Sequence, residues 1–361
     1  MAATDCCQTH SIGEYAKVIR HFIVERDSRV AREWDPRNSS LDLPLDCPYF
    51  GKVLTELEEH LPEVDLHCYL TWDWRSLPEY GNHVITILVG EERGLIPRYS
   101  RHIRMVARVM SHYPFLGIRR WWPPNRMILM LVPKYFRNWV YHFWSWLQYS
   151  FPPSSWPDSL NGKPLIVHLP WGCASLCDVP MKQINQRTQN YFFSGRIARG
   201  ANFGYRKILS SPKIVSRKSL VAAVERLEEK HKSHPSNDSI VVHRDKNPEE
   251  LKDGDHYAQH LMDSKVCLAP RGSVADTWRF FEGLKSGCIV ITNPLPDQWY
   301  YRGAPVIQID DWNELEKVII PLLGDNAKME AIHVKALKYW DEICGEKAVG
   351  RYLASVLSSS R

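Results

Sequence analysis

The stretch DSKVCLAPRGSVADTWRFFEGLKSGCIVI, residues 263–291, carries the clearest structural pattern in the chain. Its apolar run at 266–269 is typical of a buried strand, and Gly272 lies in a tight turn where the backbone can approach a ligand closely. Asp276 is a residue type that caps helices, and Gly287 is typical of a helix end. We therefore predict a strand, a turn, a helix over 276–286 and a second strand over 288–292, which is the repeating unit of an α/β fold.

The same alternation continues through the C-terminal half. The strands that we expect are 191–195, 239–243, 266–269, 288–292 and 306–309, and the helices begin at Tyr205 or cover 256–262 and 312–323. Short apolar runs that alternate with helical patterns predict a parallel sheet covered on both faces. Ligands of such sheets bind outside the carboxyl ends of the strands. Beyond this sheet, residues 328–357 are predicted to form two helices interrupted near Gly345.

The N-terminal half has a less regular pattern. The elements that we expect there are helices at 12–26 and 51–61, a strand at 83–89, a helix from Pro97 that carries Ile103, Val106, Ala107 and Met110 on one face, and a strand at 165–169. The Ser- and Pro-rich segment 151–163 is the best linker. Because 361 residues are too many for one ordinary core, we expect domains at 1–178 and 179–330 and C-terminal helices at 331–361.

The segment 93–157 has an unusual charge pattern. It contains ten Lys or Arg and no Asp or Glu, and half of the 14 tryptophans lie between Trp121 and Trp171. Basic residues interleaved with aromatic ones suit the surface of an anionic membrane, although the aromatics could equally fill the N-terminal core. Its most apolar part, 127–151, is interrupted by Pro133, Lys134 and Arg137, so it is too short to span a bilayer. Nucleic acid is a weaker alternative and is not expected as a partner, because no nucleic-acid module is recognisable.

The N-terminus and the cysteines indicate a cytoplasmic protein. The first 25 residues lack the basic start and apolar run of a secretory signal. Nine cysteines at irregular spacing are not a disulfide framework, and Cys173 with Cys177 lacks the second ligand pair of a zinc site. We expect reduced thiols and a place in the cytoplasm or on the inner face of a membrane.

The segment 263–291 also suggests a binding site. A helix N-terminus at the carboxyl end of a strand offers free amide donors and partial positive charge, which suits phosphate. Glu282 belongs to a helix rich in aromatic residues, so its carboxylate is expected to be buried and to need a partner. Taken from the residues alone, a structural pair with Arg279 is favoured over a ligand hydroxyl.

This segment resembles the signature of exostosin-like glycosyltransferases of family 47. The matching residues are Cys267, Leu268, Pro270, Gly272, Arg279, Glu282, Gly287, Cys288 and Val290. A second match is 191–195 followed by 206–209, and a weaker third is 336–340 with 348–353. Together they cover 190–357, about half of the chain. The chain departs from the pattern at Ile289-Val290, where family members often carry Pro, and its N-terminal half matches poorly.

The resemblance implies a GT-B fold, in which an N-terminal acceptor-binding and a C-terminal nucleotide-sugar-binding Rossmann-like domain face each other across a cleft. It implies an inverting transfer of a hexose or pentose, without metal or other cofactor, from a nucleoside-diphosphate sugar such as a UDP-sugar to a glycan or lipid-linked glycan, as in polysaccharide biosynthesis. Glu282 would bind the ribose, and Arg196, Arg206 and Lys207 would neutralise the diphosphate. The other residues that would line the pocket are Ser194, Gly195, Pro270, Arg271, Gly272, Ser273 and Arg279.

The acceptor hydroxyl needs a general base from the opposite domain. Glu91 and Glu92 follow the 83–89 strand at its carboxyl end, with Asp73 and His83 as further candidates; ordinary loop charges are the alternative. Neither Asp73-Trp74-Arg75 nor Asp310-Asp311 forms a convincing metal-binding Asp-x-Asp, and the latter pair is expected to cap the next helix. A non-catalytic glycosyltransferase-like subunit that binds glycan or a partner enzyme is the alternative function.

Overall fold

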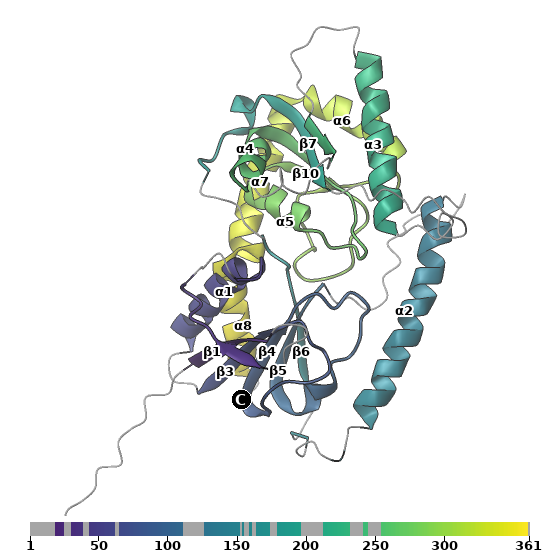
Figure 1. The fold of residues 1–361 in the computed structure, drawn as a ribbon. Helices are drawn as coiled ribbons and strands as arrows, with labels where there is room; N and C mark the ends of the chain where they lie inside the picture. Colours follow the sequence, from purple (N-terminus) through teal and green to yellow (C-terminus); the bar gives the residue numbers. More distant parts are fainter. Residues whose placement is uncertain are drawn as a thin grey trace, which may run out of the picture.

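The computed structural model describes residues 19–24, 30–38, 43–61, 65–110, 126–151, 154, 159–160, 164–173, 179–195, 212–231, 241–244 and 254–359. They form two lobes, each built around its own β-sheet (Figure 1). The N-terminal lobe lies at the bottom of that view and the C-terminal lobe at the top.

The N-terminal lobe holds a six-stranded sheet in the order β2-β1-β3-β4-β5-β6. Its strands are β1 (Ile19–Val24), β2 (Ala31–Glu33), β3 (Leu66–Thr71), β4 (Gly81–Leu88), β5 (Ile103–Val109) and β6 (Leu165–Leu169). Every neighbouring pair is parallel except β1 and β2. Helix α1 (Cys47–His60) contributes Phe50, Val53 and Leu57 to the core beside this sheet. The predictions of the 51–61 helix and of the strands at 83–89 and 165–169 are confirmed.

Two helix predictions in this lobe are wrong. Residues 19–24 of the expected 12–26 helix form β1, while 12–18 lie outside the described residues. The expected helix after Pro97 is only a short 3₁₀ turn (Arg98–Arg101) followed by β5. A central strand tolerates the basic residues of β5 because both have acceptors: Arg104 donates to the Leu357 carbonyl at 3.0 Å, and Arg108 to the Leu95 carbonyl at 2.6 Å.

The C-terminal lobe holds a five-stranded parallel sheet in the order β11-β10-β9-β7-β8. Its strands are β7 (Gln189–Gly195), β8 (Val241–Arg244), β9 (Ser264–Ala269), β10 (Ile289–Thr292) and β11 (Ile307–Gln308). Its helices are α3 (Pro212–His231), α4 (Gly254–Asp263), α5 (Trp278–Lys285) and α6 (Leu315–Leu323). The predicted alternation is confirmed, although the helix start expected at Tyr205 lies outside the described residues.

The strand order of this second sheet reverses once. The chain enters at β7, moves to β8 on one side, and then returns to β9 on the other side of β7. In doubly wound sheets the connections on either side of such a reversal lead to opposite faces, which leaves a crevice at the carboxyl ends of the two strands. The β7/β9 boundary is therefore where a ligand is expected.

The C-terminal helices pack back on the N-terminal lobe. Helix α7 (Asn326–Tyr339), a π-helical turn (Trp340–Cys344) and α8 (Glu346–Ser359) follow the second sheet, so the predicted break near Gly345 is confirmed. Helix α8 lies along α1 (Figure 1), and the Tyr49 hydroxyl donates to the Cys344 carbonyl at 2.6 Å. The domain limits 1–178, 179–330 and 331–361 stay a prediction.

Helix α2 (Arg126–Ser150) turns polar side chains inward and aromatic ones outward. The Ser145 hydroxyl accepts from the Ile96 amide at 3.0 Å, and Gln148 accepts from Arg98 at 2.6 Å. The exposed large side chains of α2 are Leu129, Val132, Phe136, Trp139, Val140, Tyr141, Phe143, Trp144 and Trp146. Core packing, the alternative considered for these aromatics, is wrong for this outward set.

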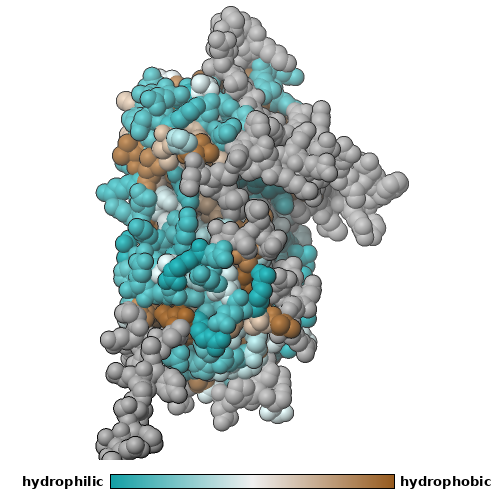
Figure 2. Space-filling view, turned by 60° about the vertical axis from the view of Figure 1, so that its left-hand side comes forward, coloured by the Kyte–Doolittle hydropathy of each residue, from teal (hydrophilic) through white to brown (hydrophobic). Residues whose placement is uncertain are grey.

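The exposed aromatic face of α2 differs from the surface shown in Figure 2, where the coloured residues are mainly hydrophilic and hydrophobic ones form small separate patches. Phe136, Trp139, Phe143 and Trp146 stack successively, with ring centroids 5.8 to 6.2 Å apart. Among the described helices, none combines the length and the apolar character needed to cross a membrane.

Candidate functional site

Several predicted site residues meet at the carboxyl ends of β7 and β9. Ser194 and Gly195 end β7, and the segment 270–273 directly follows β9. Arg279 and Glu282 lie on α5, which begins just after this turn. The strand-order reversal therefore brings together two segments that are about 75 residues apart in the sequence.

A buried hydrogen-bond network holds the turn after β9. The Asn293 side-chain oxygen accepts from the Arg271 amide at 3.0 Å, from the Ser216 hydroxyl at 2.8 Å and from the Trp312 indole at 3.2 Å. Asn293 itself follows the carboxyl end of β10. Because three elements share one acceptor, the position of the turn is set by the packing of the sheet and its helices.

The helix cap differs from the prediction. Thr277 caps α5 by accepting from the Arg279 amide at 3.2 Å, so the predicted cap by Asp276 is wrong. Asp276 is buried and instead accepts a hydrogen bond from the Tyr301 hydroxyl. The prediction for the next helix is confirmed for Asp311, whose side chain accepts from the Asn313 amide at 2.9 Å.

Arg279 ties α5 to the end of β7. Its Nε donates to the Ser194 carbonyl, and its guanidinium lies 5.4 Å from the centre of the Phe193 ring. Gly195 lies close beside it: a Cβ at that position would lie 2.6 Å from the Arg279 Nη2, so the guanidinium would have to shift. The favoured Arg279–Glu282 pair is therefore wrong as a hydrogen-bonded pair: the two side chains have different partners.

Glu282 is buried beside α4 and accepts from the Tyr257 hydroxyl at 2.6 Å through Oε2. Burial raises the pKa of Glu282, while the Tyr257 hydrogen bond and the nearby Arg279 charge act in the opposite direction. Among the described residues, Tyr257 is the hydrogen-bond partner of Glu282 and contacts only Oε2. Oε1 of Glu282 can therefore accept from a hydroxyl group of a ligand. A buried carboxylate with one oxygen to offer suits a ligand that brings its own hydroxyl groups.

Two cations from different lobes meet at this turn. Lys134 on α2 donates through Nζ to the carbonyl of Ser273. Burial, together with the charges of Arg271 and Arg137, lowers the pKa of Lys134 to about 8, although Glu92 acts in the opposite direction. Burial also lowers the pKa of Arg271 to about 10. Lys134 and Arg271 repel each other, and little water reaches them to screen this repulsion. An anion bound between the two cations would therefore be strongly favoured.

The candidate bases lie in different surroundings. Glu91 is buried and accepts from the Arg93 and Leu95 amides, each at 2.8 Å, and from Arg108 at 3.5 Å. Glu92 is exposed and acts electrostatically on Lys134. Asp73 accepts from the Arg75 amide at 2.8 Å.

All three predicted diphosphate ligands, Arg196, Arg206 and Lys207, lie outside the described residues. In contrast, Lys134 and Asn293 were not predicted as site residues. Lys134 was counted only as part of the basic segment, and its approach to Ser273 joins positions 139 residues apart. Asn293 directly follows a predicted strand, and that position was the one available signal.

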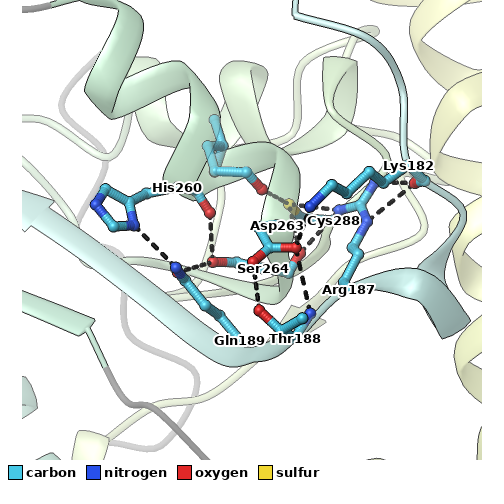
Figure 3. Close-up of polar contacts among 9 residues, drawn as sticks. Lys182, Arg187, Thr188, Gln189, His260, Asp263, Ser264 and Cys288 are labelled. Carbon is cyan, nitrogen blue, oxygen red and sulfur yellow. Dashed lines mark hydrogen bonds and ion pairs between the residues drawn. The ribbon is translucent and has the colours of Figure 1, made fainter.

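At the opposite edge of the C-terminal sheet, where the strands begin, polar side chains bind one another and the backbone (Figure 3). Arg187 donates to the Lys182 carbonyl at 3.1 Å, to the Ser264 carbonyl at 2.8 Å and to Cys288 Sγ at 3.2 Å. Asp263 accepts from Lys182 at 2.6 Å and from Thr188. The six cysteines among the described residues are buried and form no disulfide with one another, whereas Cys6, Cys7 and Cys177 lie outside the described residues.

No protein-family model and no curated protein sequence matches the chain. Among solved structures it is similar to the GtfA/B complex, at 12% identity and a TM-score of 0.38, and to the pneumococcal O-GlcNAc transferase GtfA in complex with UDP and GlcNAc, at 14% and 0.37; each likeness covers 77% of this chain and 57% of the other. The chain therefore spans little more than half the length of these two structures.

Sucrose-phosphate synthase from Thermosynechococcus elongatus is similar at 10% identity and a TM-score of 0.40, over 89% of this chain and 80% of that one. These likenesses concern only the arrangement of helices and strands. The predicted α/β class is confirmed by the topology itself: two largely parallel sheets, with C-terminal helices that return to the first lobe as in the GT-B fold.

Proposed function

We propose that the chain is an inverting, metal-independent glycosyltransferase of the exostosin-like kind. It would transfer a sugar from a nucleoside diphosphate, with UDP as the first candidate, to a glycan or lipid-linked glycan. The observation that carries this proposal is that Lys134, which is partly buried, contacts the turn after β9, which contains buried Arg271. Buried Glu282 lies on α5, just after the same turn, at the strand-order reversal of the C-terminal sheet. Each of these groups matches one part of a nucleotide-sugar.

The cations match the diphosphate. When the bond to the sugar breaks, negative charge grows on the leaving nucleoside diphosphate, and fixed positive groups stabilise the transition state more than the ground state. Arg271 and Lys134 would supply that charge from opposite lobes, and Arg206 and Arg196 would add to it. Glu282 would accept hydrogen bonds from the ribose hydroxyls through the oxygen that Tyr257 leaves available.

Glu92 is the base that we propose. It would take the proton of the acceptor hydroxyl as the hydroxyl oxygen attacks the anomeric carbon and the diphosphate leaves with the bonding electrons. The influence of its charge on Lys134, which we propose binds the diphosphate, supports this choice. Both oxygens of Glu91 already hold the loop 91–95, which suits a structural role.

The test is a melting-temperature screen of the full chain with UDP, GDP, CMP and their sugars, in the presence of EDTA. We expect one nucleoside diphosphate to raise the melting temperature and Glu282→Gln to reduce that rise. As a matched control, Glu316→Gln changes an exposed carboxylate on α6 and should leave the rise intact. A rise with oligosaccharide but with none of the nucleotides would instead favour a non-catalytic glycan-binding or partner subunit.

We further propose that the outward face of α2 docks on an anionic membrane on the cytoplasmic side, where a lipid-linked acceptor would be presented. The stacked rings of α2 are exposed, and Arg93 and Arg137 are exposed beside them within a segment that has no acidic residue. Aromatic rings at headgroup depth combined with cations match an anionic lipid surface rather than a neutral one.

Vesicle flotation tests this docking. We expect binding to phosphatidylcholine vesicles that contain phosphatidylserine, weaker binding without phosphatidylserine, and loss of binding in Trp139→Ser/Phe143→Ser. Val334→Ser, which changes an exposed apolar residue on α7, is the control. Equal flotation of all variants, or none of the wild type, would contradict the proposal without affecting the nucleotide site.

A further inference from the structure

A cluster of two histidines and a carboxylate lies at the amino ends of β3 and β4. His67 is the second residue of β3, His83 is the third residue of β4, and Glu79 belongs to the loop between them. His67 Nδ1 lies 2.7 Å from Glu79 Oε2, and His83 Nε2 lies 2.7 Å from Glu79 Oε1. The three groups can each aim one ligand atom at a shared point, since these atoms all lie within 4.8 Å of one another.

We propose that His67, Glu79 and His83 bind a divalent transition-metal ion, Zn²⁺ in the first instance. Two imidazole nitrogens and one carboxylate oxygen are a donor set that zinc takes, with water as the fourth ligand. Metal–ligand bonds of about 2.0 to 2.2 Å separate tetrahedral ligands by about 3.3 Å. The candidate ligand atoms lie between 2.7 Å and at most 4.8 Å apart, so the closest would move apart and the more distant ones closer together around the ion. The side chains are 17%, 36% and 38% exposed, which gives the ion a way in and room for a water.

The surroundings orient these ligands. The Tyr69 hydroxyl donates to Glu79 Oε2 at 2.9 Å, and Phe22 packs edge-on against the His67 ring with 5.5 Å between ring centres. Gly81, at φ +144°, leaves space for the His83 ring, because a Cβ there would lie 2.7 Å from the ring atom Cε1. Hydrogen-bonded and packed partners of this kind fix ligand direction in metal sites.

The carboxylate lies between the two imidazole rings, with Oε2 facing His67 and Oε1 facing His83. A hydrogen-bonded His-Glu-His group without metal has the same contacts, so the experiment must separate the two.

The place of the cluster indicates a structural rather than a catalytic ion. His67 and His83 lie at the amino ends of parallel strands, whereas Glu91 and Glu92 follow the carboxyl end of β4. Bound metal would hold the loop between β3 and β4 against the sheet. This proposal does not depend on the proposed function, and sugar transfer without metal remains compatible with it.

The test uses the full chain, stripped with chelator and then titrated with Zn²⁺ alone. We expect one zinc bound per cluster, and a rise of about 5 °C in melting temperature at a zinc concentration about 100-fold above the dissociation constant. Co²⁺ at the same site should give the visible absorption bands of a tetrahedral complex. Mg²⁺, which prefers oxygen ligands, should give no rise.

Variants assign the site, because cysteines elsewhere in the chain can also bind zinc. His83→Gln and Glu79→Gln should each lower zinc affinity at least about tenfold, and His67→Gln/His83→Gln should abolish the melting shift and the cobalt bands. His60→Gln, which changes a histidine on α1 outside the cluster, is the matched control. Circular dichroism confirms folding of each variant, and His83→Gln at a partly exposed position covers the case in which the double variant unfolds. A zinc shift that survives in the folded variants, or no shift in the wild type, overturns the proposal.

Discussion

The two sheets belong to the same class yet place their charged groups differently. In the C-terminal sheet the strand order reverses between β7 and β9, and buried Arg271 and Glu282 lie beside the carboxyl ends of those strands. In the N-terminal sheet the parallel strands follow one another in one direction from β1 to β6. There the carboxyl-end acid Glu91 is bound by its own loop, and the His67, Glu79 and His83 cluster occupies the opposite edge. Strand order, more than fold class, decides where along its carboxyl edge a parallel sheet can receive a ligand.

We expect the largest effect on activity from the proposed base, Glu92, in the N-terminal lobe. We expect Glu92→Gln to lower the rate of sugar transfer by about 1000-fold, because the acceptor hydroxyl loses its base. Nucleotide binding, measured by melting shift, should stay unchanged. Glu91→Gln is the comparison variant: it should lower stability through the loop 91–95. If Glu92→Gln transfers sugar at the wild-type rate, the proposed base is wrong.

We expect the second-largest effect on activity from Arg271, the buried cation beside the C-terminal sheet. Arg271→Met is expected to lower kcat/KM by about 100-fold, since the leaving diphosphate loses a fixed positive group. Steady-state kinetics with the donor identified by the melting screen would measure this. Arg302→Met, which removes an exposed arginine paired with Asp297, is the control and should have little effect. Equal kinetics in the two variants would remove Arg271 from the site.

The amino edge of the C-terminal sheet should respond in stability instead. Arg187→Met leaves the carbonyls of Lys182 and Ser264 without their donor, and we expect a loss of about 2 kcal/mol in the free energy of unfolding. Denaturant titration measures this change. Lys182→Met, which breaks only an exposed ion pair with Asp263, should cost less than about 1 kcal/mol. If Arg187→Met lost as much free energy of nucleotide binding as of unfolding, the amino edge would also contribute to the nucleotide site.

The smallest effect concerns pH. Lys134, with a pKa near 8, is mostly protonated at pH 7 and mostly neutral at pH 9. Since the diphosphate stays ionised over this range, we expect nucleotide affinity to fall severalfold as pH rises from 7 to 9. In Lys134→Met, affinity at pH 7 should already be reduced and the pH dependence should be flatter. Calorimetric titration at several pH values measures the nucleotide affinity. If affinity depends on pH in Lys134→Met as strongly as in the wild type, Lys134 does not contact the diphosphate.

Local patterns explain where prediction from the sequence succeeded. In 263–291 each element is signalled by adjacent residues: a short apolar run for β9, a turn with Gly272, and Gly287 after α5. The burial of Glu282 also follows from its aromatic neighbours on the helix. The pattern was ambiguous where β-branched residues alternate with arginine, as in β1 and β5, because short apolar runs fit helix and strand equally well.

The sequence by itself determined that the chain is α/β and that its C-terminal half is a parallel sheet with helices between the strands. The anion site at one turn after a strand stays a prediction. Only the tertiary structure decided the partners. Tyr257 for Glu282, Ser194 for Arg279 and Lys134 for the Ser273 turn are contacts across 25, 85 and 139 residues. The physical reason is that periodicity and capping act over a few residues, whereas the partner of a buried charge depends on which elements the whole fold packs together.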